Sequence, residues 1–196
     1  MRYTNPILWI SLTIEEGKSI IPTHFTPLER SMPVSPEELR TTMRAWATGV
    51  TIVGVQHEGI LHGMTVSSFT SVSLNPPLVL VSLEIGTRTQ QLVQKAGNFG
   101  VTVLSAAQQE VSNCFANPNT DLGDRFAGRE VFYLTTGAPF LHGGVAFFDC
   151  RVVNVLPAGN HEILIAEVLA TKVNSSAGGD PDPLIYFNRR YRQIQN

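Results

Sequence analysis

The stretch GGVAFFDCRVVNVLPAGNHEILIAEVLATKV, residues 143–173, decides the fold. Two long runs rich in Val, Ile, Leu and Phe flank the sequence PAGN at residues 157–160. Such runs are typical of strands, and Pro and Gly between them mark a turn. We therefore expect a long β-hairpin, the clearest in the chain.

Further strands are predicted on both sides of this hairpin. VTIVGVQ (50–56) and ILHGMTVSS (60–68) flank a short turn with Gly and form a second hairpin. PPLVLVSL (76–83) is a continuous apolar run after two prolines, which favours a strand covered on both faces. FGVTVLS (99–105) and PLIYFNRRYRQI (183–194) each predict one more strand.

Three short helices complete the prediction. Ser35 and Glu38 form a capping box around Pro36, and Gly49 closes this first segment. The second helix begins at a Thr cap and ends at a Gly, and the third begins at a Ser cap. The residues concerned are Leu39, Met43 and Trp46 at helical spacing in the first helix, Thr87 and Gly97 in the second, and Ser105 in the third.

The order of these elements favours a mainly β protein with short helices. The strands follow one another as hairpins and do not alternate with helices, so a parallel sheet is disfavoured and an antiparallel barrel fits best. At 196 residues the chain fits one domain, which we place at residues 35–196. Residues 1–34 form an N-terminal extension: an extra strand, an arm to a partner subunit, a disordered segment, or the product of an upstream start codon.

Composition excludes several classes of protein. The net charge of −2 gives no reason to expect nucleic-acid or acidic-membrane binding. No apolar run reaches the roughly 18 residues of a transmembrane helix, and ILWISLTI (7–14) lacks the flanks of a secretory signal. Cys114 and Cys150 are interpreted as reduced, mostly buried thiols of a cytoplasmic protein, with a disulfide or a reactive thiol as the alternative.

The usual catalytic motifs are missing from the sequence. It contains no GxGxxG, no complete P-loop, no HExxH and no GxSxG. The five histidines form no tight cluster, so we expect no metal site. No dedicated catalytic residue stands out.

The segment HGMTVSSFTSVS, residues 62–73, is unusually rich in hydroxyl side chains. Short donors and acceptors beside a buried strand suit the polar rim of an aromatic cofactor. The alternative is a polar edge strand in which Thr and Ser serve β-propensity and turn formation. Ser82, Arg88 and Thr89 follow at the start of a helix, where a guanidinium and hydroxyls suit a phosphate; a solvated Arg on an ordinary cap is the alternative.

The sequence resembles the flavin reductase-like, FMN-binding split-barrel family, particularly the reductase components of two-component flavin-dependent monooxygenases. Seven stretches carry the resemblance in consistent order, from about Ser35 to the C-terminus. They are MRAWATGVTIV, GMTVSSFTSVSLNPPLVLVSL, AGNFGVTVL, DRFAG, GAPFLHGGVAFFDCRV, GNHEILIAEV and PLIYFNRRYR.

The resemblance implies an antiparallel split barrel and roles for specific residues. A flavin, FMN or alternatively FAD, is held at its ring by one segment and at its phosphate by another, with an aromatic residue nearby. The nicotinamide of NADH or NADPH meets a histidine turn and the C-terminal segment, and a further loop covers the flavin. The ring residues are Thr65, Val66, Ser67 and Ser68; the phosphate residues Ser82, Arg88 and Thr89; the aromatic residue Phe99; the nicotinamide residues His161, Tyr186 and Arg189; and the covering loop Asp124, Arg125 and Phe126. Asn160 replaces the Asp that the family has before this histidine. The alternatives are an ordinary core position for Phe99, a solvent-exposed His161 at a hairpin turn, and a surface loop with one buried Phe at residues 124–126.

The implied activity is hydride transfer from NADH or NADPH to the flavin, which supplies reduced flavin to a separate monooxygenase. The resemblance also implies a homodimer. Three alternatives stay open: a flavoprotein electron carrier of the same fold with tightly held FMN, a non-catalytic flavin-binding module, and an enzyme similar to the pyridoxamine phosphate oxidases.

Overall fold

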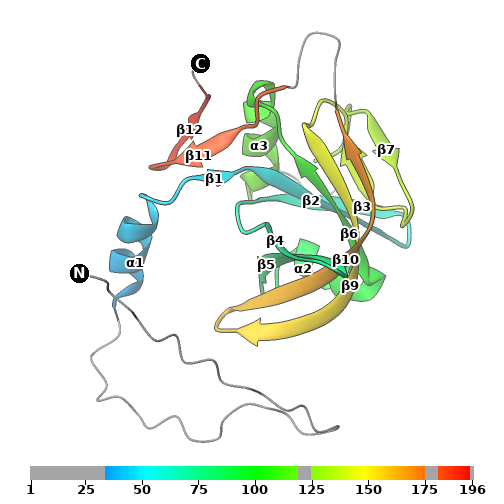
Figure 1. The fold of residues 1–196 in the computed structure, drawn as a ribbon, viewed down its shortest axis with the longest axis horizontal. Coiled ribbons are helices and arrows are strands. Elements are labelled where there is room, and N and C mark those ends of the chain that lie inside the picture. The colour runs from blue at the N-terminus through cyan, green and yellow to red at the C-terminus, as the bar shows by residue number, and fades with distance from the viewer. Residues whose placement is uncertain (1–33, 119–124, 175–180, 195–196) are drawn as a thin grey trace, which may run out of the picture.

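A seven-stranded antiparallel sheet forms the body of the molecule in the computed structural model (Figure 1). The structure describes residues 34–118, 125–174 and 181–194. The strand order is β3-β2-β6-β9-β10-β5-β4, so the predicted antiparallel architecture is confirmed. Its strands are β2 Thr51–His57, β3 Ile60–Val66, β4 Thr70–Leu74, β5 Pro77–Glu84, β6 Asn98–Val103, β9 Ala146–Ala158 and β10 His161–Val173.

Both predicted hairpins are confirmed. β9 and β10 pair along their whole length and turn at Gly159, which has a φ of 64°. β2 and β3 turn at Glu58 and Gly59, whose φ values of 49° and 78° fit the tight turn that joins antiparallel strands. The long β9–β10 hairpin sits in the middle of the strand order and joins β6 to β5.

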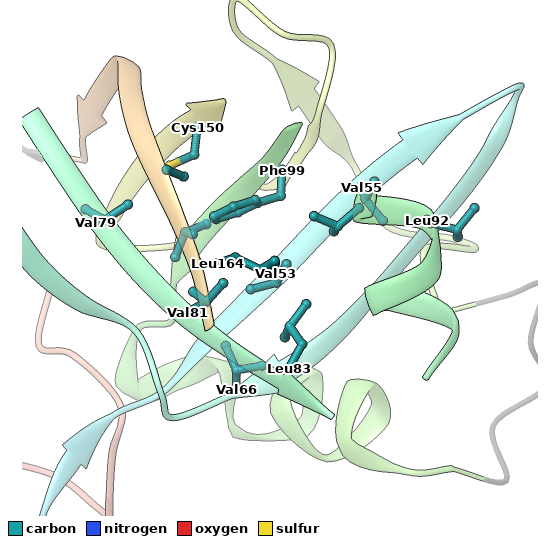
Figure 2. Close-up of a cluster of buried hydrophobic side chains, with 13 residues drawn as sticks. Val53, Val55, Val66, Val79, Val81, Leu83, Leu92, Phe99, Cys150 and Leu164 are labelled. Carbon is teal, nitrogen blue, oxygen red and sulfur yellow. The ribbon is translucent and has the colours of Figure 1, made fainter. Parts of the chain in front are cut away.

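A core of valines, leucines and Phe99 fills the space between the strands (Figure 2). β5 contributes Val79, Val81 and Leu83, all buried, while Leu80 between them is only half-buried. The prediction that this strand is covered on both faces is therefore wrong. Because strand side chains alternate, one face points into the core and the other is only partly covered.

The helices begin at the predicted caps. Ser35 and Glu38 form the capping box of α1, Pro36–Met43, and Gly97 ends α2, Arg88–Ala96, in the left-handed conformation. The third helix begins after Ser105 as a 3-10 turn, Ala106–Gln108, and continues as α3, Gln109–Ala116.

The first helix is shorter than its apolar pattern indicates. It ends at Met43, and Trp46 lies beyond it in the connection to β1, Thr48–Gly49. Leu39, Met43 and Trp46 are all more than half exposed. Figure 1 shows α1 standing apart from the sheet, which explains why its apolar side chains remain uncovered.

Several short strands were not predicted. The C-terminal run is a tight hairpin of β11, Ile185–Phe187, and β12, Arg190–Arg192, rather than one strand. β1 joins β11 in a separate three-stranded sheet, and β7, Val131–Tyr133, pairs with β8, Pro139–Leu141. β4 is an exposed edge strand, so the polar edge-strand interpretation is confirmed for residues 70–74.

Some predictions fall outside the described residues. These are the N-terminal extension up to residue 33 and Asp124 of the loop predicted to cover the flavin. Among the described residues, no helix is long and apolar enough to cross a membrane.

Candidate functional site

A large cleft opens where the hydroxyl-rich segment faces α1 and the C-terminal hairpin. Its volume is about 860 Å³, within the range of small-molecule sites. One wall is the segment from Ser67 to Thr70, and the other carries guanidinium and aromatic groups. The lining residues on that second wall are Arg40, Met43, Arg44, Trp46, Ala47, Thr48, Gly49, Tyr186, Asn188 and Arg189.

The hydroxyls of the predicted ring-binding segment have different tasks. Thr65 donates from Oγ1 to the carbonyl oxygen of Ser112 at 2.7 Å, which joins β3 to α3. Ser68 Oγ donates to the carbonyl oxygen of Ser82 at 2.9 Å and accepts from its N–H at 3.1 Å. Ser67 and Thr70 line the cleft without a side-chain hydrogen bond to any described residue. The hydroxyls of Ser67 and Thr70 are therefore available to a ligand in the cleft.

A smaller pocket of about 180 Å³ adjoins the cleft. Ser67 and Tyr186 line both spaces, so Tyr186 stands between them. Thr65 and the buried Val66 line only the smaller pocket. The Tyr186 ring packs edge-on against Tyr191 at 5.5 Å, which fixes its position.

None of the predicted phosphate residues lines the cleft. The backbone of Ser82 is one hydrogen bond from Ser68, which does line the cleft. Arg88 is half-buried at the first position of α2. Thr89 is only 1% exposed, and its Oγ1 lies 2.9 Å from Nδ1 of His62. The Thr89 hydroxyl is therefore already bound inside the protein.

His62 is a buried neutral histidine that the sequence did not single out. Burial, together with the positive charges of Arg125 and Arg88, lowers the pKa of His62 to about 4. Its Nε2 is buried without a hydrogen-bond partner among the described residues. The imidazole therefore stays uncharged at neutral pH, in contact with Thr89 in the first turn of α2.

His161 lies where the β9–β10 turn meets the end of β5. Its Nδ1 is 2.9 Å from Oδ1 of Asn160, and the carbonyl oxygen of Asn160 accepts from the N–H of Ile85 at 3.0 Å. The Asn160 amide also donates to Oε1 of Glu84 at 3.4 Å. An amide can serve both neighbours, whereas the Asp of the family pattern would place a second carboxylate beside Glu84.

Three residues predicted beside the flavin, Phe99, Arg125 and Phe126, contact other parts of the protein in this chain. Phe99 is fully buried in the core, so it has no surface for a ligand (Figure 2). Arg125 is 8% exposed and donates to the carbonyl oxygens of Gly63 at 2.7 Å and Asn117 at 2.8 Å. Phe126 packs edge-on against Phe115 at 4.9 Å. Arg125 and Phe126 thus hold α3 against β3.

The cleft contains hydrogen-bonding and cationic groups but no acid or base of intermediate pKa. None of the described residues that line it is His, Asp, Glu or Cys. Such a site suits a planar, anionic ligand and a reaction in which the protein contributes binding and orientation. Sequence reasoning missed Arg40, Arg44 and Trp46, because they lie on a helix and a loop with no recognisable motif.

Residues 43–195 match the flavin reductase like domain. The chain is 41% identical over 145 residues to a probable flavin reductase from Rhizobium meliloti, covering 74% of this chain and 45% of that protein. It is 36% identical to an FMN reductase (NADH) RutF from Ancylobacter novellus, covering 82% and 86% of the two chains. Nitrilotriacetate monooxygenase component B from Mycobacterium thermoresistibile has a similar structure, with a TM-score of 0.75, 31% identity and coverage of 81% and 86%.

Proposed function

The chain belongs to the flavin reductase like family, and we propose that its cleft between the hydroxyl segment and α1 is the site where flavin and nicotinamide meet. The protein is a nicotinamide-dependent flavin reductase that supplies reduced flavin to a separate monooxygenase. The observation that carries the placement is the pair of unbonded hydroxyls, Ser67 and Thr70, facing guanidinium groups across one open space.

The residues present fit a flavin. A flavin ring offers carbonyl and N–H groups along one edge, which short hydroxyls and backbone groups can satisfy at close range. Ser67 and Thr70 supply the hydroxyls, and Tyr186 supplies an aromatic wall. Ser68 holds the backbone of Ser82 in place and so fixes the wall that the flavin would contact. We assign the flavin phosphate to the region of Ser82 and Arg88, at the start of α2, because a helix N-terminus favours an anion.

The chemistry that flavin supplies when bound is acceptance of hydride at N5 from C4 of the nicotinamide. This chain's residues bind and orient the partners, and proximity alone can lower the barrier by several kcal/mol. Hydroxyl donors of Ser67 and Thr70 would favour negative charge on a bound ring. We assign His161, Tyr186 and Arg189 to the nicotinamide nucleotide, and we expect no proton transfer from a dedicated acid.

We propose FMN or FAD as the flavin and NADH as the electron donor. The RutF relative is named an FMN reductase (NADH), and a neighbour of TM-score 0.76 is named an NADH:FAD oxidoreductase. Both cysteines are free thiols, which supports a reducing, cytoplasmic location.

We also propose that the protein is a homodimer. Five large apolar side chains on β4 and β9 are exposed: Val72 at 48%, Leu74 at 93%, Val153 at 52%, Val155 at 38% and Leu156 at 43%. β4 is also a sheet edge, and edges of this kind are usually covered. Analytical ultracentrifugation should give twice the chain mass of 21.4 kDa, with Leu74→Glu shifting the population to monomer. A monomeric wild type at micromolar concentration would rule the dimer out.

An absorbance scan with added FMN, followed by anaerobic NADH, tests the function. Flavin bands that shift on binding and bleach with NADH are expected. Bands that bleach only with a stronger reductant would indicate an electron carrier. The absence of any flavin binding would leave a non-catalytic barrel and overturn the placement of the site.

A further inference from the structure

The second wall of the cleft carries more positive charge than the flavin ring requires. Arg40 and Arg44 from the α1 region and Arg189 from the β11–β12 turn all line it. Glu37 is the carboxylate that pairs with the first two, at 3.5 Å and 3.9 Å. The Arg40–Glu37 pair is exposed, and the Arg44–Glu37 pair is long and has an exposed carboxylate, so both pairs are weak. Among the described residues, Arg189 has no ion pair, so this wall is a cationic surface.

A hydrogen bond and a strained turn hold two of these arginines in place. The carbonyl oxygen of Arg44 accepts from the N–H of Asn188 at 3.1 Å, which joins the end of α1 to the turn that carries Arg189. Asn188 and Arg189 have φ values of 50° and 59°, in the left-handed region where such turns favour Asn-Gly. An Arg at the glycine position is strained, and strain of this kind is often kept for function.

Two more features of the wall indicate a ligand. Nε of Arg44 is buried and has no hydrogen-bond partner within the described part of the chain. Trp46 lines the cleft with 65% of its surface exposed, next to Met43. An exposed indole beside guanidinium groups is a surface on which a planar base stacks.

We propose that this wall binds the adenosine diphosphate moiety that NADH and FAD share. Trp46 stacks on the adenine, while Arg40, Arg44 and Arg189 pair with the two phosphates. The inference rests on the proposed function, because that function places the reactive rings between Ser67 on the first wall and Tyr186 on the second. The cleft of about 860 Å³ is large enough for a ring system at each wall.

Direct binding of ADP-ribose, measured by calorimetry, tests the subsite without turnover. The wild type should bind ADP-ribose, and Arg44→Gln and Arg189→Gln should each weaken it about tenfold, equivalent to about 1.4 kcal/mol. Trp46→Ala should weaken it similarly, and Trp46→Phe should restore most of the loss. Arg192→Gln is the matched control, because Arg192 is exposed on the same hairpin but does not line the cleft.

Steady-state and flavin-binding measurements identify the source of the moiety. If NADH supplies it, Arg44→Gln raises the KM for NADH with FMN as acceptor and leaves the Kd of FMN within twofold. If FAD supplies it, the Kd of FAD rises while that of FMN does not. Circular dichroism confirms folding, and Arg189→Gln replaces any variant of α1 that misfolds.

Three results would overturn the proposal. The first is a wild type that does not bind ADP-ribose while still reducing flavin with NADH. The second is unchanged ADP-ribose binding in all the arginine and tryptophan variants. The third is a weakened dimer with unchanged ADP-ribose binding, which would assign this wall to a second copy of the chain. A protein that binds ADP-ribose but reduces no flavin would refute the proposed function and keep the subsite.

Discussion

Nδ1 of His62 and Oγ1 of Thr89 lie 2.9 Å apart, and both side chains are buried. This contact joins β3 to the first turn of α2, next to Arg88. Burial of His62, together with the positive charges of Arg125 and Arg88, disfavours a charged imidazole. The folded site of His62 therefore favours the neutral imidazole.

The pKa of His62 predicts a loss of stability in mild acid. A histidine in the unfolded chain titrates near pH 6.5, whereas folded His62 does so at about 4. Between these values the unfolded chain binds a proton that the folded chain does not, so the free energy of unfolding falls as the pH drops from 6.5 to about 4. The loss should approach about 3 kcal/mol at the acid end.

Urea unfolding of wild type and His62→Gln at pH 7 and pH 4.5 measures this contribution. Gln keeps a hydrogen-bonding group but does not titrate. From pH 7 to pH 4.5, the unfolding free energy of the wild type should fall by about 2 kcal/mol more than that of His62→Gln. Parallel curves would show that His62 titrates normally.

The hydroxyls of Ser67 and Ser68 should differ in what they contribute. Ser67→Ala removes a hydroxyl that faces the cleft and bonds to no described residue, so we expect about fivefold weaker flavin binding and an unchanged Tm. Ser68→Ala leaves the N–H and carbonyl of Ser82 without their partner, so it should lower stability by about 1 to 2 kcal/mol as well as flavin affinity.

Flavin fluorescence titration and thermal melts separate these two effects. Ser71→Ala is the control, because Ser71 is an exposed residue of β4 outside the cleft. Equal flavin affinity for wild type and Ser67→Ala would remove this hydroxyl from the site.

Local signals explain which elements were predictable. The capping box of Ser35 and Glu38 and the left-handed Gly97 are each set by residues within one turn, and the structure keeps both. The β11–β12 hairpin was missed because its turn is Asn188–Arg189, without the glycine that marks such turns. The turn is stabilised by a long-range contact, the hydrogen bond from the N–H of Asn188 to the carbonyl oxygen of Arg44, which a local sequence pattern cannot indicate.

The site was predictable in outline but not side chain by side chain. The hydroxyl segment does border the cleft, yet the tasks of Thr65 and Ser68 depend on Ser112 and Ser82, 47 and 14 residues away. Arg125 looked like part of a loop over a cofactor, but it is buried by carbonyl groups that only the folded chain brings together. Sequence thus located the segment, and tertiary contacts decided which groups remain free.

His161 should affect the nicotinamide more than the flavin. Its ring contacts Asn160 in the β9–β10 turn, near the end of β5. It does not belong to the wall from Ser67 to Thr70 that we assign to the flavin ring. His161→Ala should raise the KM for NADH about fivefold, equivalent to about 1 kcal/mol, with the Kd of FMN unchanged. His57→Ala is the control, since His57 ends β2, which pairs with β3 and β6 and not with the β9–β10 hairpin that carries His161. A KM equal to that of the wild type would exclude this role.

Asp149 should be the costliest carboxylate to remove. It is fully buried in β9, and its Oδ2 accepts from the N–H groups of Thr135 at 2.6 Å and Thr136 at 2.8 Å. Its Oδ1 accepts from the Thr136 hydroxyl. Asp149→Ala removes all three acceptor contacts, and hydrogen bonds to a charged group are worth about 1.5 to 3 kcal/mol each before the freed donors regain water.

We therefore expect Asp149→Ala to lower the free energy of unfolding by about 3 kcal/mol, measured by urea denaturation. Asp182→Ala is the matched control and should change stability by less than about 0.5 kcal/mol, because Asp182 is exposed. Asp149 does not line the cleft, so folded Asp149→Ala should bind FMN as the wild type does. If Asp149→Ala and Asp182→Ala lost the same free energy of unfolding, the hydrogen bonds of Asp149 would contribute nothing measurable to stability.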